Sequence, residues 1–167
     1  MSAGEVTRPT PLPAALEVRE LLEGLLGRDV EGTVGTPVVD PHKDPGAVVG
    51  VYVDDLLKLR AIVVMEMPLA AYTGAAIALI PARTAQDSVE AGLISPMLFD
   101  NTTEILNVGA SLFNHDGCPH LRLYETYAPR ETLPADIDKW VLAYVQRLDM
   151  ELDVTGYGKG NISVLVV

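Results

Sequence analysis

The hydrophobic and polar positions along the chain follow two different periods. Apolar residues recur every three or four positions over 13–26 and 96–114, as in helices that bury one face. Gly27, directly after the first of these segments, is a typical helix end. The same reasoning predicts two further helices, at 68–80 and 134–145.

Shorter apolar runs that are rich in β-branched residues indicate strands. These runs lie at 30–39, 48–53, 57–65, 121–127, 147–154 and 161–167. Two hairpins are predicted, one across Asp54 and Asp55 and one across the glycine-rich residues 156–160, which fit no phosphate-binding fingerprint. Residues 40–46 read as a turn-rich loop, and the pattern at 82–92 does not decide between helix and loop. The order of strands and helices predicts an α+β fold, a sheet covered by long helices.

One apolar segment is long enough to cross a membrane. Residues 61–82 carry a single charge, on Glu66, but the segment changes character at Pro68. Its first part is rich in Ile, Val and Met and suits a strand, whereas its second part is rich in Ala and suits a helix. A buried strand followed by a buried helix explains the segment without lipid.

Composition limits the class of protein. The 167 residues predict a single domain over 13–167, preceded by a flexible segment at 1–12 that has no signal-peptide pattern. The net charge of −11 argues against nucleic acid as a partner, because a phosphate backbone would be repelled. The single cysteine cannot form an internal disulfide. We therefore expect a cytoplasmic protein that binds neither nucleic acid nor membrane.

One of the predicted helices has an unusual polar face. Winding residues 98–114 at 100° per residue places short carboxylate, hydroxyl and amide side chains on one side. This polar stripe comprises Asp100, Thr103, Glu104, Asn107, Ser111 and Asn114. A solvated helix face usually mixes Lys or Arg with Glu, but the polar stripe has no cation. It therefore suits presentation to a partner, with Asp100, Thr103 and Ser111 as candidate partner-binding residues.

Four residues on and after this helix form a pattern. Glu104 follows Asp100 by four positions, Asn107 follows Glu104 by three, and Pro129 comes after the 21 residues 108–128. The pattern resembles the motif of the CheC/CheX/FliY family, whose members remove phosphate from phosphorylated response-regulator receiver domains. The resemblance implies a CheC-like α+β sheet covered by long helices and built from two pseudo-duplicated αββ halves.

The first helix carries a weaker echo of the motif. Residues 20–23, Glu-Leu-Leu-Glu, resemble residues 104–107, Glu-Ile-Leu-Asn, and Pro45 repeats the spacing of Pro129 from its helix. Glu23 stands where an amide would be needed. We therefore expect one working motif, as in the CheX members of the family.

The resemblance implies a role for each motif residue. Hydrolysis of an aspartyl phosphate needs a water in line with the phosphorus, and an amide can orient that water, so Asn107 is the expected water-positioning residue. Glu104 is expected to pair with a lysine of the receiver and so anchor the helix. Asp100 has a second explanation, helix capping or solubility. Pro129 is expected to shape a neighbouring loop.

The same resemblance implies the partners. The protein would need no cofactor or metal of its own, because the receiver brings a divalent cation, Mg²⁺ in the usual case, and a lysine. The expected partners are a phosphorylated CheY-like receiver domain and a second copy of this chain, in a homodimer joined at an edge strand of the sheet.

Two other functions fit parts of the sequence. A catalytically silent adaptor of chemotaxis or two-component signalling would bind a receiver through the same helix without turnover. A metal-dependent hydrolase would use the metal-capable side chains of the loop 115–120, which are His115, Asp116, Cys118 and His120. These form only one cluster, whereas structural zinc sites usually show paired and spaced ligands, so a polar turn explains them more simply. An isolated Glu-x-x-Asn is itself usually a solvated helix face.

Overall fold

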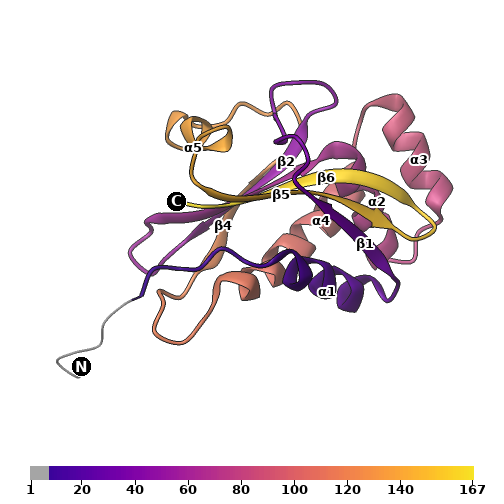
Figure 1. Cartoon of the computed structure of the whole chain (residues 1–167). Coiled ribbons are helices and arrows are strands. Elements are labelled where there is room, and N and C mark those ends of the chain that lie inside the picture. Colours follow the sequence, from indigo (N-terminus) through magenta and orange to yellow (C-terminus); the bar gives the residue numbers. More distant parts are fainter. Residues whose placement is uncertain (1–7) are drawn as a thin grey trace.

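The structure is a computed structural model that describes residues 8–167 of the chain. Helices and strands are mixed along the sequence, as Figure 1 shows. The elements are α1 Ala15–Leu26, β1 Val30–Val34, β2 Ala47–Val53, β3 Leu59–Glu66, α2 Met67–Ile77, α3 Ala82–Ala91, α4 Pro96–Val108, the 3₁₀ helix η1 Gly109–Phe113, β4 Arg122–Tyr127, α5 Ala135–Val141, β5 Gln146–Val154 and β6 Gly158–Val166. This is the α+β architecture that the sequence predicts.

The strands form one six-stranded antiparallel sheet in the order β1–β5–β6–β3–β2–β4. Both predicted hairpins, β2–β3 and β5–β6, are present. If β1, β2 and β3 are exchanged with β4, β5 and β6, respectively, the same strand order is obtained in reverse. The sheet therefore has a pseudo-two-fold axis between β6 and β3. The predicted duplication is therefore visible in the topology. Each half has a helix and three strands, one strand more than in the αββ halves we expected, because the edge strands β1 and β4 pair with the hairpin of the opposite half.

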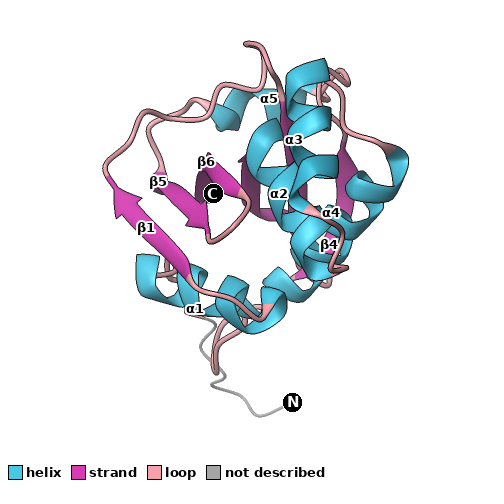
Figure 2. Cartoon of the chain, turned by 90° about the vertical axis from the view of Figure 1, so that its right-hand side faces the viewer, coloured by secondary structure: helices cyan, strands magenta, loops and turns pink. Residues whose placement is uncertain are grey.

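The two faces of the sheet are covered differently. Helices α1, α2 and α4 bury the larger core on one face, whereas α5 and the loop before β2 cover part of the other. Figure 2 shows α2, α3 and α4 gathered beside one another, with α1 apart from them below β1. Only one face therefore carries long helices, and α4 belongs to that layer.

The long apolar segment is internal to this core. It forms β3 and then α2, with Glu66 and Met67 at the change from strand to helix. Most of α2 is buried under its neighbours, which explains the Ala-rich sequence. Within the described part of the chain, no helix is both long enough and apolar enough to cross a membrane.

Several element boundaries differ from the predicted ones: the helix predicted at 134–145 ends at Val141, and the strand predicted at 161–167 begins at Gly158. β1 ends at Val34 because Gly35 takes a left-handed conformation, with φ +80°, and the chain leaves the sheet. Residues 82–91 form the helix α3, which Gly92 ends in the same way at φ +70°. The helix predicted at 96–114 is α-helical only as far as Val108 and then tightens into η1.

The start of the described chain is tied to the loop before β4. Residues 1–7 of the predicted flexible segment lie outside the described residues. The Arg8 N–H donates to the Gly117 carbonyl at 2.6 Å, and the Arg8 guanidinium donates to the Asp116 carbonyl. The Cys118 thiol lies 3.6 Å from the Pro9 carbonyl.

Candidate functional site

The polar stripe lies on α4, whose start is set by Ser95 and Pro96. The Ser95 hydroxyl accepts a hydrogen bond from the Leu98 N–H at 3.2 Å, and Pro96 occupies the first helical position, where its missing N–H costs nothing. Asp100 lies one turn further on and is exposed. Ser95 is therefore the helix cap, and capping does not explain Asp100.

Small and polar residues fix α4 against α2. A Cβ on Gly74 would lie 2.6 Å from the Leu98 carbonyl oxygen, so glycine is required for this close approach. The Thr102 hydroxyl lies 2.9 Å from the Ala70 carbonyl, and the Asn101 amide donates to the Gly74 carbonyl at 2.9 Å. These contacts set how α4 is rotated about its own axis.

The sheet holds the other end of α4. A Cβ on Gly50 of β2 would lie 3.1 Å from Leu106 Cδ1, so glycine lets the helix lie close to the strand. Two residues along the same face of β2, the hydroxyl of the buried Tyr52 donates to the Leu106 carbonyl at 2.6 Å. Burial raises the pKa of Tyr52, so its hydroxyl stays a donor.

The fixed helix turns three motif residues outward. Asp100, Glu104 and Asn107 are all exposed. No ion pair among residues 8–167 involves Asp100 or Glu104. A carboxylate and an amide thus lie one helical turn apart on a helix that α2 and β2 hold in place. These side chains can enter a site on a partner without any rearrangement of the backbone.

The remaining residues of the polar stripe have other surroundings. The Thr103 hydroxyl lies 3.3 Å from the Thr126 hydroxyl of β4, at the border of the exposed face. Ser111 is exposed but lies on η1, where a rotation of 100° per residue no longer applies. The Asn114 amide donates to the Leu121 carbonyl at 3.1 Å and accepts from the Leu121 N–H at 2.8 Å, so it closes the loop before β4 rather than facing a partner.

Two apolar residues next to the stripe escaped the sequence analysis. On α4, Met97 and Val108 lie beside Glu104 at 100° per residue. Their exposed fractions are 53% and 43%, unlike the fully packed residues of the apolar face. The sequence did contain a signal for their exposure, because both residues fall outside the apolar stripe that the helix buries. They make the surface around Glu104 partly apolar, as is typical of protein interfaces.

Pro129 lies in a loop rather than on the helix. A Cβ on Gly46, before β2, would lie 3.1 Å from Pro129 Cβ. The next residue, Arg130, pairs with Asp44 of the loop before β2 at 2.8 Å. These contacts fit the expectation that Pro129 shapes a neighbouring loop.

The counterpart helix in the other half, α1, uses its motif-like residues structurally. The Glu23 carboxylate accepts from the Val30 N–H at 3.2 Å and lies 3.7 Å from Arg19 Nε, so it fastens the start of β1. Pro45 lies between β1 and β2, and Pro129 lies between β4 and β5, so the two prolines fall in corresponding connections of the two halves. The described α1 therefore offers no second Glu–amide pair.

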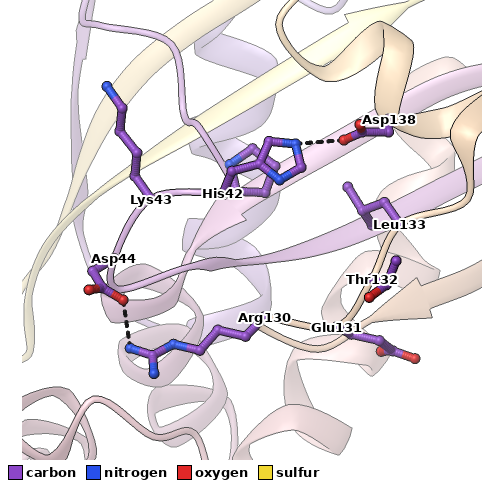
Figure 3. A pocket seen from close by; sticks show the side chains of 9 residues that line it. His42, Lys43, Asp44, Arg130, Glu131, Thr132, Leu133 and Asp138 are labelled. Atoms are coloured by element: carbon purple, nitrogen blue, oxygen red, sulfur yellow. Dashed lines mark hydrogen bonds and ion pairs between the residues drawn. The ribbon is translucent and has the colours of Figure 1, made fainter.

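A polar pocket opens on the α5 side of the sheet (Figure 3). It encloses about 420 Å³ between the loop before β2 and the loop after β4. Two ion pairs lie within it, His42 with Asp138 at 2.6 Å and Arg130 with Asp44 at 2.8 Å. These two contacts join the loop before β2 to α5 and to the loop after β4, and none of the lining residues belongs to the polar stripe.

The loop after η1 does not assemble a metal site. Among residues 8–167, no group of three His, Cys, Asp or Glu side chains is placed to hold an ion. His115 Nε2 lies 3.1 Å from the Leu112 carbonyl, and the backbone at 116–118 contacts the N-terminal segment. The geometry of this loop gives the metal-dependent hydrolase no support.

Comparison with known proteins gives a match in structure but not in sequence. No protein-family model and no curated protein matches the chain. The FliM middle domain from H. pylori is 8% identical over 91% of this chain and 84% of that chain, with a TM-score of 0.55. FliY from Thermotoga maritima is 15% identical over 89% and 82%, with a TM-score of 0.52.

A third solved structure is the CheX–CheY–BeF3–Mg complex from Borrelia burgdorferi. The matching chain is 10% identical over 88% of this chain and 90% of that chain, with a TM-score of 0.47. At such identities the likeness concerns the fold. The chain has the CheC-like α+β fold, which it shares with the FliM middle domain and with FliY.

Proposed function

We propose that this protein is a phosphatase that acts on the aspartyl phosphate of a CheY-like receiver domain. The observation that carries the proposal is the exposure of Glu104 and Asn107, one turn apart, on a helix fixed by α2 and β2. The fold shared with FliY supports it, since the motif resemblance implies the same family.

Asn107 is the proposed catalytic residue. Its amide oxygen accepts a hydrogen bond from the attacking water, and its NH₂ group donates one to a neighbouring acceptor, so the water is aimed at the phosphorus. The water oxygen forms a bond to phosphorus as the bond from phosphorus to the aspartyl oxygen breaks. The products are a free carboxylate, inorganic phosphate and a proton. The receiver supplies the divalent cation, Mg²⁺, and this chain contributes no cofactor.

Glu104 is the proposed docking residue. Its carboxylate forms no ion pair with residues 8–167, so it can pair with the lysine that the receiver holds beside its phosphate. Met97 and Val108, exposed beside it, exclude water from that pair when they are covered. Asp100, Thr103 and Ser111 lie around this pair as further partner contacts.

The test is the decay of a phosphorylated receiver domain from the same genome, with Mg²⁺, in the presence and absence of the full chain. We expect the wild type to accelerate decay. Asn107→Ala should lose on the order of 10² to 10³ of that acceleration, the usual cost of removing one catalytic hydrogen-bonding group. Circular dichroism and thermal unfolding should be unchanged, because the Asn107 side chain is exposed.

The matched control is Gln86→Ala, which removes an exposed amide from α3 instead of α4. It should hydrolyse at the wild-type rate. Equal acceleration by wild type and Asn107→Ala would reject the water-positioning role.

A binding module without turnover is the second candidate function. The fold of FliM supports it, because solved structures hold FliM in complexes with FliG and with SpeE. A chain that binds phosphorylated receivers without shortening the lifetime of the phosphate would be this adaptor. The phosphatase and the adaptor would both bind the receiver, and only the phosphatase would hydrolyse its phosphate.

A further inference from the structure

A buried tyrosine is attached to the turn that carries Asn107. Tyr52 of β2 is 1% exposed, and its hydroxyl donates to the Leu106 carbonyl at 2.6 Å. Leu106 directly precedes Asn107 in the chain. The hydrogen bond therefore acts on the backbone one residue from the proposed catalytic amide.

The end of α4 needs such a partner. The last four carbonyls of an α-helix have no intrahelical N–H to accept from, and Leu106 lies in this last turn. The chain then tightens into η1 at Gly109, so the helix itself does not determine the geometry of its end. The hydroxyl of a strand residue here replaces the missing helical partner.

Packing makes the position of the tyrosine rigid. The rings of Tyr52 and Phe113 have centroids 5.0 Å apart at an interplanar angle of 56°, and Phe113 is fully buried at the end of η1. Gly50, on the same face of β2, lets the Leu106 side chain approach the strand. The hydroxyl thus joins the packed sheet to the last turn of α4.

We propose that Tyr52 is a positioning residue for Asn107, and that it sets the rate of hydrolysis rather than the affinity for the receiver. The inference rests on the proposed function. A displacement of about 1 Å at a reacting group costs on the order of 10²-fold in rate, so one hydrogen bond on the adjacent carbonyl has a large effect on turnover. Glu104 lies a full turn earlier, where Thr102 and Asn101 fix the helix, so docking does not depend on Tyr52.

The chain offers a matched control. Tyr157 is also buried, and its hydroxyl donates to a backbone carbonyl, that of Ile80, at 2.5 Å. This contact joins the β5–β6 turn to the end of α2 and does not involve α4. Tyr157→Phe and Tyr52→Phe therefore remove the same chemical group, a hydroxyl that donates to a backbone carbonyl, but only Tyr52 contacts the turn of Asn107.

The experiment measures kcat and KM for a phosphorylated receiver at a temperature well below the midpoint of unfolding of every variant. For Tyr52→Phe we expect kcat to fall at least about 10-fold with KM within about two-fold, on the scale of known misplacement effects. Tyr157→Phe should keep both parameters within about two-fold. A wild-type kcat in Tyr52→Phe, or equal losses in both variants, would overturn the proposal, because a general loss of stability affects both alike.

Amide hydrogen exchange separates this inference from the proposed function. If the wild type hydrolyses no receiver phosphate, the proposed function fails. The exchange of the amides at 107–110 still tests the role of Tyr52. Faster exchange in Tyr52→Phe than in Tyr157→Phe and wild type supports it. Unchanged exchange, or fast exchange of these amides already in the wild type, would overturn it even if Tyr52→Phe proved too unstable for kinetics.

Discussion

At the scale of single residues, Asp54 shows how a buried carboxylate shapes a turn. It is 5% exposed and accepts hydrogen bonds from the backbone N–H groups of Leu56 and Lys58 at 2.9 and 3.0 Å and from Arg60 Nε at 2.9 Å. The β2–β3 turn is thereby fixed although Leu57 takes a left-handed conformation, with φ +61°. Because it accepts three hydrogen bonds, the Asp54 carboxylate stabilises the turn in its charged form.

The protonation of Asp54 makes stability depend on pH. Although burial acts to raise it, hydrogen bonds from Lys58, Arg60 and Leu56 hold the pKa of Asp54 below the ordinary value of 3.8. A pKa lower in the folded state means that the carboxylate stabilises the fold above about pH 4, and that this contribution disappears as the pH falls through the folded-state pKa. Asp54→Asn should therefore lower the free energy of unfolding at pH 7 by about 1 to 3 kcal/mol and flatten its acid dependence. Urea unfolding between about pH 2 and 7 measures both.

The neighbouring Asp55 is the matched control, because it is exposed. Asp55→Asn should leave the free energy of unfolding within about 0.5 kcal/mol of wild type. Identical pH profiles for the two variants would show that the turn does not depend on the Asp54 carboxylate.

A substitution of Glu104 is expected to affect binding of the receiver more than the rate of hydrolysis. Reversing its charge in Glu104→Lys should raise the dissociation constant for a phosphorylated receiver by roughly 10-fold or more, because it replaces a charge-assisted pair by repulsion. The maximal rate at saturating receiver should change much less. Surface-plasmon or calorimetric titration together with saturation kinetics measures the two quantities. A lower maximal rate with unchanged affinity would move Glu104 from docking to chemistry.

At the scale of elements, the contact between α2 and α4 determines where the polar stripe points. Gly74→Ala would place a methyl group 2.6 Å from the Leu98 carbonyl oxygen, so the two helices must separate. We expect a loss of about 1 to 3 kcal/mol in unfolding free energy, the usual cost of overpacking. Gly24→Ala on α1 has no neighbour within 4 Å and should stabilise by up to about 1 kcal/mol through helix propensity. Urea unfolding compares the two, and equal effects would mean that the α2–α4 contact is not tight.

The elements also show what the sequence could predict. Local patterns were sufficient for α1, for both hairpins and for the exposure of Glu104 and Asn107, because period and turn residues are visible in the chain itself. The change from α4 to η1 was not predicted, because the apolar positions keep a helical spacing past Val108, whereas the contacts at this end of the helix come from Tyr52, more than fifty positions earlier in the sequence. Asn114 was placed on the polar stripe for the same reason: the winding of an ideal helix was carried past Gly109. The catalytic roles on α4 rest on resemblance and remain predictions.

At the scale of the whole molecule, the pseudo-two-fold sheet has two free edges, β1 and β4. The two halves differ at corresponding positions of their first helices, α1 and α4. In one half, the Glu23 carboxylate accepts a hydrogen bond from the start of β1, and in the other half Asn107 is exposed and α4 lies beside β4. The proposed functional face therefore belongs to one half of a duplicated framework, and the other half completes the sheet beneath it.

The expected homodimer would join two sheets at one of these edges, and β4 is the better candidate. It contains Leu123, Tyr124 and Thr126, residues that favour strands, whereas β1 is shorter and contains Gly32. Sedimentation equilibrium at micromolar concentration should give twice the chain mass of 17.9 kDa. Tyr124 is 56% exposed on β4, and Tyr124→Lys should shift the mass toward the monomer, because two like charges would then meet across the two-fold axis.

The same substitution on the other edge is the control for the dimer. Thr33→Lys, on the exposed part of β1, should leave the dimer intact. Dissociation by Thr33→Lys but not by Tyr124→Lys would assign the interface to β1, and a single-chain mass for the wild type would reject the homodimer. If β4 is the interface, the two α4 helices flank the joined edges, and each dimer presents two copies of Asn107. Receiver binding would then saturate at two receivers per dimer, which the same sedimentation experiment measures once a receiver is added.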